Sequence, residues 1–179
     1  RPEYPMDCLD WTMAREYCKI WLGGDLPSEW EWEKAARGTD GRTFPWGEEL
    51  PDCFRCNVWQ GCGPGEGNST WPVGYLADGS GNSPFGLVDV CGNVEEFTKS
   101  SLFNVGEDFD IDDATHVPGN FVVTRGGSVW SLDSPMEPWK YPQFTTYSRW
   151  GYIPMAAFHS RAGVGFRCIR PPNDATPTL

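Results

Sequence analysis

The sequence is poor in the features that mark several familiar protein classes. It contains only two histidines, His116 and His159, and a lone histidine on a loop is more often a surface residue than a ligand. No run approaches the roughly eighteen apolar residues of a membrane span, so no membrane-spanning helix is expected. The sequence lacks a glycine-rich phosphate loop, a serine–histidine–aspartate pattern of a catalytic triad and a metalloprotease motif. These absences exclude the most familiar hydrolase and nucleotide-binding classes.

Basic residues are also scarce. Lys and Arg total 14 against 25 Asp and Glu, which gives a net charge of −11. Proteins that bind nucleic acids normally carry clustered Lys and Arg, so no nucleic-acid partner is expected. Much of the acidity lies in the stretch 107–113, which is expected to be a solvated surface loop, with a cation site as the alternative.

What the chain does contain favours one loop-rich domain. Its 21 Gly, 16 Pro and 10 Trp are typical of a fold in which large aromatic side chains fill the space between short elements. A length of 179 residues suffices for a single domain with a real core. We expect that domain to span residues 1–170 and to be followed by a frayed tail over 171–179.

Seven cysteines are many for a reduced cytosolic domain of this size and indicate an extracytoplasmic protein. No signal peptide is visible, but a mature secreted chain would look the same after cleavage. The odd count leaves at least one thiol free or paired outside the chain. Cys53, Cys56 and Cys62 could be read as a zinc knuckle. Because a fourth ligand at the usual spacing is missing, a disulfide within this loop is favoured.

Two helices are predicted near the N-terminus. Apolar residues recur at helical spacing over residues 10–22, and two glycines follow. Ser28 and Glu31 form a capping box for a second helix that reaches about Arg37. After this helix, short apolar runs such as 121–124 alternate with turns, which fits short strands and long loops.

Six motifs occur in one order along the chain: LPSEWEWEKAARG (26–38), FPWG (44–47), PVG (72–74), FGLVDVCGNVEEF (85–97), RGGS (125–128) and GFRC (165–168). Together they resemble the formylglycine-generating enzyme, or sulfatase-modifying factor, family. The resemblance runs from about Pro5 to Arg170. It implies an α+β, loop-rich, C-type-lectin-like fold with two helices near the N-terminus and short antiparallel strands. The opening strands of the family domain have no counterpart before Arg1, so we expect a trimmed chain or a partner chain that supplies them.

The catalytic segment of that family departs from its pattern here. Family enzymes place two cysteines just after Gly-Gly-Ser, where they hold copper and oxidise a substrate thiol. The matching positions are Ser131 and Met136. A hydroxyl and a thioether cannot replace the thiolates that Cu(I) requires. We therefore expect no formylglycine-generating activity.

The resemblance also implies calcium as a cofactor. At the first family site, Asp89 and Glu96 would supply carboxylates, and Gly92 and Val94 would supply main-chain carbonyls. The alternative is an acidic turn in which the two carboxylates only cap local amides.

Two further features follow from the family. Asn57 and the Val58 carbonyl match the first half of a second calcium site, although the loop that follows is shorter than in family enzymes. Cys18 and Cys168 occupy the positions that form a disulfide in the family, so they are expected to be paired.

A ligand surface is expected between Ser128 and Arg161, a region that surrounds the binding cleft in this fold. Aromatic rings interleaved with arginine give a large contact area at small entropic cost, although about half of these rings are expected to be core. The candidate ligand-binding residues are Trp130, Trp139, Tyr141, Tyr147, Arg149 and Trp150. The ligand would be a protein, a peptide or a glycan.

The sequence thus predicts a non-catalytic, extracytoplasmic binding or structural domain, stabilised by calcium and by disulfides. The alternative is a divergent metal-dependent oxidase, or a domain like the iron-dependent sulfoxide synthases, completed by a missing segment or a partner. Calcium alone in the purified protein would favour the first reading. Stoichiometric copper or iron would favour the second.

Overall fold

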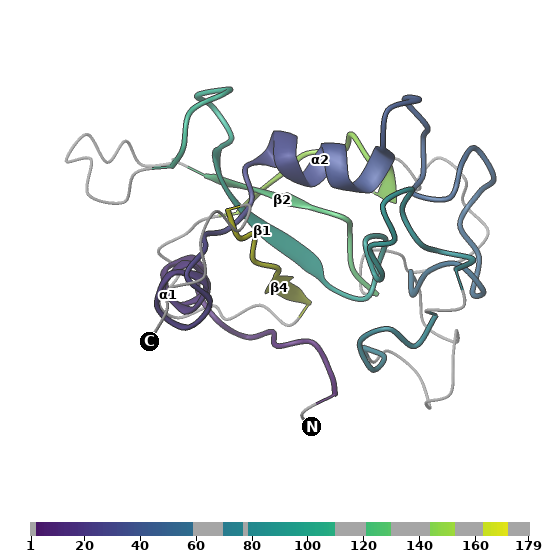
Figure 1. Cartoon of the computed structure of the whole chain (residues 1–179), viewed down its shortest axis with the longest axis horizontal. Coiled ribbons are helices and arrows are strands. Elements are labelled where there is room, and N and C mark those ends of the chain that lie inside the picture. The colour runs from purple at the N-terminus through teal and green to yellow at the C-terminus, as the bar shows by residue number, and fades with distance from the viewer. Residues whose placement is uncertain are drawn as a thin grey trace.

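The computed structural model describes residues 3–58, 70–76, 79–109, 121–129, 144–152 and 163–171. Along the chain the elements are α1 (Trp11–Leu22), α2 (Glu29–Arg37), β1 (Glu95–Ser101), β2 (Val122–Arg125), β3 (Trp150–Tyr152) and β4 (Val164–Phe166). In Figure 1, α2 lies above β1 and β2, and α1 lies below them, so the strands run between the two helices.

Helix α1 is set by its caps and anchored by one tryptophan. The Asp10 side chain accepts a hydrogen bond from the Met13 amide at 2.8 Å, and Gly23 ends the helix at a φ of 63°. The Trp11 ring is buried, and its Nε1 donates to the Thr98 carbonyl oxygen of β1 at 2.7 Å. The predicted first helix is confirmed, and this bond fixes its start against the sheet.

Helix α2 begins with the predicted capping box. The Ser28 side chain accepts from the Glu31 amide, and the Glu31 carboxylate accepts from the Ser28 amide at 2.7 Å. The helix turns an unusual face inward, because Glu29 is fully buried together with Trp32 and Ala36. A buried carboxylate requires a partner, and that partner comes from the sheet.

The sheet has the order β3-β2-β1-β4. Strands β1 and β2 are antiparallel, as are β2 and β3, but β4 runs parallel to β1 with Glu96 opposite Gly165. The predicted antiparallel strands are therefore confirmed for β1, β2 and β3, and β4 adds a parallel neighbour. A parallel neighbour needs a long crossover connection, and here the chain between β1 and β4 also forms β2 and β3.

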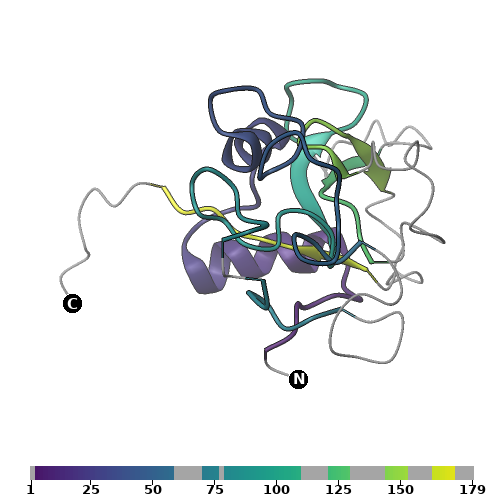
Figure 2. The same ribbon diagram turned by 90° about the vertical axis from the view of Figure 1, so that its right-hand side faces the viewer.

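The expected disulfide between Cys18 and Cys168 is present, with a sequence separation of 150 residues. It joins α1 to the segment that follows β4. Figure 2 shows β4 running alongside α1, and Tyr17 of the helix packs edge-on against Phe166 at 5.6 Å between ring centroids. In the chain-entropy view a loop of this size contributes roughly 4 to 5 kcal/mol at most.

The other cysteines fall into two groups. Cys53 is also disulfide-bonded, and Cys62, the other end of the loop in which a disulfide was expected, lies outside the described residues. Among the described cysteines, Cys8, Cys56 and Cys91 are free thiols.

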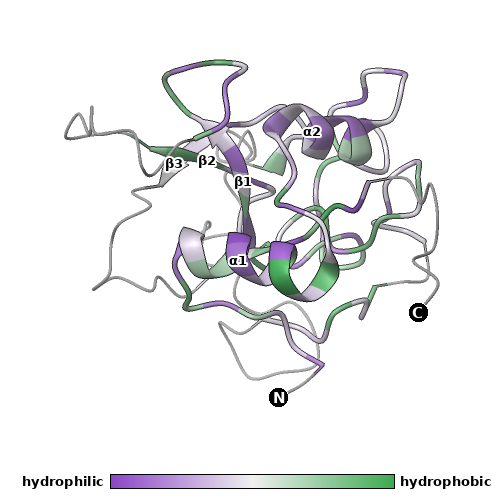
Figure 3. Cartoon of the chain, turned by 60° about the vertical axis from the view of Figure 1, so that its left-hand side comes forward, coloured by the Kyte–Doolittle hydropathy of each residue, from purple (hydrophilic) through white to green (hydrophobic). Residues whose placement is uncertain are grey.

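Part of the exposed surface of α1 is apolar. Figure 3 shows one end of this helix in strongly hydrophobic colours, and the side chains of Met13, Ile20 and Trp21 are all more than half exposed. Among the described residues, no helix has both the length and the apolar character needed to cross a membrane.

Candidate functional site

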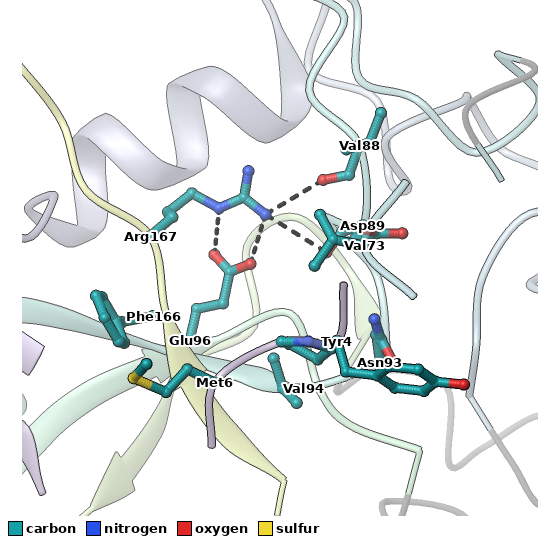
Figure 4. Close-up of a pocket in the computed structure, with 11 residues that line it drawn as sticks. Tyr4, Met6, Val73, Val88, Asp89, Asn93, Val94, Glu96, Phe166 and Arg167 are labelled. Carbon is teal, nitrogen blue, oxygen red and sulfur yellow. Dashed lines mark hydrogen bonds and ion pairs between the residues drawn. The ribbon is translucent and has the colours of Figure 1, made fainter. Parts of the chain in front are cut away.

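A pocket of about 290 Å³ opens where the start of β1 meets β4 (Figure 4). Its walls come from the first described residues, from the turn before β1, and from both strands. They include Met6, Val73, Asp89, Val94, Glu96 and Arg167. Apolar walls with a few charged groups at one side are typical of a binding site.

The centre of the pocket is an ion pair between the strands. Both Glu96 oxygens accept from Arg167, through Nε and Nη2, at 2.5 Å each. Trp32 of α2 adds a third hydrogen bond, from Nε1 to Glu96 Oε2 at 2.6 Å. Burial alone would lower the pKa of Arg167, but the Glu96 charge and these hydrogen bonds outweigh it and raise that pKa. The two residues meet because Glu96 lies opposite Gly165, two positions before Arg167.

Asp89 adds a second carboxylate to the same pocket. Its backbone is left-handed, with a φ of 53°, and its Oδ2 accepts from the Gly74 amide at 2.6 Å. Burial raises the pKa of Asp89, and the neighbouring Glu96 charge acts in the same direction, against the Gly74 amide and Arg167. Two carboxylates thus face one guanidinium, and the ionised pocket carries a net charge of about −1 by this count.

The residues predicted to bind calcium are brought partly together. Asp89, Val94 and Glu96 all line the pocket. Gly92 lies in a parallel bridge with Asn57, which joins the two predicted calcium segments. Val58, the neighbour of Asn57, is fully buried.

The donor chemistry of this region fits a hard cation. The side chains that line the pocket offer carboxylate oxygens, which calcium prefers, but the Glu96 oxygens would have to be shared with Arg167. Within the described residues, no three His, Cys, Asp or Glu side chains gather closely enough to hold a metal ion by themselves. Main-chain carbonyls would have to complete the shell, so calcium stays a prediction.

The predicted ligand surface is described only in part. Trp130, Trp139 and Tyr141 lie outside the described residues. Tyr147 and Trp150 are about half exposed, at 50% and 49%, and remain available for contact.

Arg149 plays a different part from the other candidates for ligand contact. It is 28% exposed, and its Nε and Nη2 bind Glu29 at 2.5 and 2.9 Å. This side chain is therefore bound to α2.

Sequence reasoning missed the buried charge cluster that holds this surface in place. Arg125, at the end of β2, is fully buried and donates through Nη2 to Glu29 at 3.1 Å and to Glu33 at 3.3 Å. Burial lowers the pKa of Arg125, while the two carboxylates oppose that shift. The only signals in the sequence are an arginine at the head of the RGGS motif and a glutamate in the first turn of a helix.

A family model described as "Sulfatase-modifying factor enzyme 1-like domain" matches residues 1–172. The formylglycine-generating enzyme of Thermomonospora curvata is 34% identical over 96% of this chain and 57% of its own length. That of Streptomyces coelicolor is 35% identical over 99% of this chain and 55% of its own length. The chain therefore spans about half the length of these relatives. A protein named "Inactive C-alpha-formylglycine-generating enzyme 2" from Bos taurus is 36% identical over 61% of this chain and 37% of its own length.

Solved structures share the fold. CarF superposes with a TM-score of 0.64 at 16% identity, over 96% of this chain and 69% of its own. PvdO from Pseudomonas aeruginosa gives a TM-score of 0.65 at 24% identity, over 93% of this chain and 61% of its own. At such identities the likeness speaks for the fold alone. It confirms the predicted α+β, C-type-lectin-like architecture.

Proposed function

Because the chain belongs to the sulfatase-modifying factor enzyme 1-like family, we propose that it is a non-catalytic binding or structural domain of that family. One observation carries this proposal. The only cysteine after Gly127 in the sequence is Cys168, and Cys168 is disulfide-bonded to Cys18. A copper-dependent thiol oxidase needs two thiolates on the loop that follows Gly-Gly-Ser, and this chain has Ser131 and Met136 there.

The relatives support this reading without deciding it. The family contains enzymes, and it also contains proteins named as inactive in Bos taurus and Mus musculus. Membership alone therefore leaves activity open, because function lies in the site rather than in the fold. The absence of cysteine at Ser131 and Met136 favours a binding or structural role over catalysis.

The proposed ligand surface lies around β3. Tyr147 and Trp150 present half-exposed rings, and the Arg37 guanidinium lies over the Tyr147 ring at 5.6 Å from its centroid. Arg149, which lies between these two aromatic residues in the sequence, is bound by Glu29. Rings held on a rigid frame lose little entropy on binding, which suits a protein, peptide or glycan ligand.

Calcium is the proposed cofactor, and the pocket charge is its main support. Asp89 and Glu96 would hold the ion together with the carbonyls of Gly92 and Val94, and calcium would supply a structural cross-link between the turn and β1.

We further propose an extracytoplasmic location, which is supported by the bonded cysteines Cys18, Cys53 and Cys168.

The absence of catalysis is tested with a cysteine-containing sulfatase peptide and added copper. The expected result is no formylglycine above a blank that contains copper and peptide only, while the Thermomonospora curvata enzyme serves as the positive control. Product above the blank would overturn the proposal. Stoichiometric copper or iron in the purified protein would also count against it.

Calcium is tested by the difference in melting temperature between calcium and excess chelator. A ligand at one hundred times its Kd stabilises the folded state by about 2.7 kcal/mol, which gives a clear shift. Asp89→Asn and Glu96→Gln should both remove this difference, whereas Glu16→Gln, on the exposed face of α1, should keep it. Since Glu96→Gln also breaks the Arg167 pair, Asp89→Asn is the decisive variant. An unchanged difference in Asp89→Asn would contradict the site.

A further inference from the structure

Two free thiols, Cys56 and Cys91, lie together in the interior. Each is only 2% exposed, and both belong to one apolar cluster with Phe44, Val58 and Phe144. They come from segments far apart in the sequence, the loop that contains Cys56 and the turn before β1. The Cys56 thiol makes a hydrogen bond to the Cys91 side chain.

The backbone holds the two cysteines in register. Asn57 and Gly92 form a parallel bridge, and the Asn93 amide donates to the Asn57 carbonyl oxygen at 2.7 Å. Each cysteine directly precedes one partner of this bridge. The approach is close, because a Cβ at Gly92 would lie 2.3 Å from the Asn57 oxygen. Paired strands are spaced by about 4.8 Å, and disulfides span Cα separations of about 4.4 to 6.8 Å.

From this contact and register we propose that Cys56 and Cys91 are a modification site: a dithiol that closes to a disulfide across the Asn57–Gly92 bridge. The inference does not depend on calcium or on a ligand surface. The remaining described cysteines do not compete for it, since Cys18, Cys53 and Cys168 are already bonded and Cys8 is exposed.

The oxidant is a small-molecule disulfide such as oxidised glutathione. One protein thiolate attacks a sulfur of that disulfide, which forms a mixed disulfide and releases one small thiol. The second protein thiolate then attacks the protein sulfur and releases the second small thiol. The pair loses two protons and two electrons, and the small disulfide is reduced to two thiols. Because the site is buried, the exchange proceeds during folding or local opening.

Closure would change the fold in one defined place. The new bond would tie the loop at residues 52–58 to the turn at 88–94, which already meet at the Asn57–Gly92 bridge. That turn carries Asp89 and forms one wall of the pocket. The bond would close a loop in the unfolded chain, lower its conformational entropy and so stabilise the folded domain.

Peptide mapping of the whole chain after incubation in glutathione buffers tests the proposal. As the oxidised fraction rises, Cys56 and Cys91 should leave the alkylatable pool together, and a peptide linking them should appear with the mass of two lost hydrogens. Cys8, which is exposed, should instead take up glutathione. Separate glutathione adducts on Cys56 and Cys91, a link to Cys53 or Cys8, or thiols that persist after refolding in oxidised buffer would each overturn the proposal.

Thermal unfolding provides the second measurement. Oxidation should raise the Tm of the unmodified chain by about 4 to 16 °C, the range given by a disulfide in a domain of this size. Cys91→Ala should lose this oxidant-dependent rise, and Cys8→Ala should keep it. If Cys91→Ala does not fold, the peptide map of the unmodified chain decides. A rise that survives in a folded Cys91→Ala protein would refute the assignment.

Discussion

Replacing Glu29 with glutamine should destabilise the domain more than any surface change. Glu29 is fully buried and accepts hydrogen bonds from Arg125 and from Nε and Nη2 of Arg149. Glutamine keeps the shape but removes the negative charge. Glu33, at 3.3 Å, would then be the remaining carboxylate at Arg125, whose Nη1 also donates to the Thr146 and Ser148 carbonyl oxygens. Arg149 would lose its carboxylate partner, and its Nη2 would keep the contact to the Leu102 carbonyl oxygen at 3.4 Å.

The magnitude follows from the cost of an uncompensated buried charge. Removing one partner of a buried ion pair costs about 3 to 5 kcal/mol. In a domain of 150 to 250 residues, each kcal/mol lowers the Tm by about 2 to 4 °C, so a fall of roughly 6 to 20 °C is expected. Urea unfolding of Glu29→Gln measures the free energy directly. Glu16→Gln is the matched control and should stay within about 0.5 kcal/mol of the unmodified chain.

A double-mutant cycle separates charge pairing from packing. Arg149 is 28% exposed, so Arg149→Gln removes one partner without burying a new charge. If Glu29 and Arg149 stabilise each other, the double variant should lose less than the sum of the two single variants, by about 0.5 to 3 kcal/mol. Strict additivity, or a loss below about 1 kcal/mol for Glu29→Gln, would refute the reasoning.

Two further predictions concern a carboxylate and a glycine. Burial raises the pKa of Asp25, but the hydrogen bonds and charge of Arg15 outweigh burial, and the pKa is lowered. The ion pair therefore stabilises the fold above the unfolded pKa of about 3.9, and this stabilisation is lost as the pH falls through the folded pKa. Asp25→Asn should therefore cost about 1 kcal/mol at pH 6 in urea unfolding, and this gap should close in acid; a gap independent of pH would contradict the pairing. Gly92→Ala combines a φ of 75° with a Cβ only 2.3 Å from the Asn57 oxygen, whereas Gly86→Ala has a φ of 78° and open space. Gly86→Ala should cost about 1 to 2 kcal/mol and Gly92→Ala clearly more, and equal losses would show that the close approach is relieved without cost.

Local signals in the sequence predicted the local structure well. The helical spacing of apolar residues over 10–22, the two glycines after it and the capping box at Ser28 predicted α1 and α2, because these signals are local in the sequence. The disulfide between Cys18 and Cys168 could not be derived in this way. It followed from a resemblance that covers both ends of the chain.

What the sequence could not reveal depends on contacts between distant segments. Nothing near Glu29 indicates that it is buried, since its partners are Arg125 and Arg149. The parallel direction of β4 was missed for the same reason, because a strand of only three residues has no sequence pattern that indicates its direction. Contacts of this kind arise only when the crossover brings β4 back beside β1.

The contact between Glu96 and Arg167, which the sequence also could not reveal, changes the case for calcium. Taken from the sequence, Asp89 and Glu96 are two carboxylates on one turn, and their repulsion argues for a cation between them. The fold already supplies a cation, because the register of β4 brings Arg167 onto both oxygens of Glu96. A calcium ion must therefore compete with a guanidinium at Glu96, while Asp89 has only the Gly74 amide at its carboxylate among the bonds described. Asp89 is consequently the residue at which calcium has most to gain, and the charge that it leaves uncompensated is the strongest argument that the pocket accepts a cation.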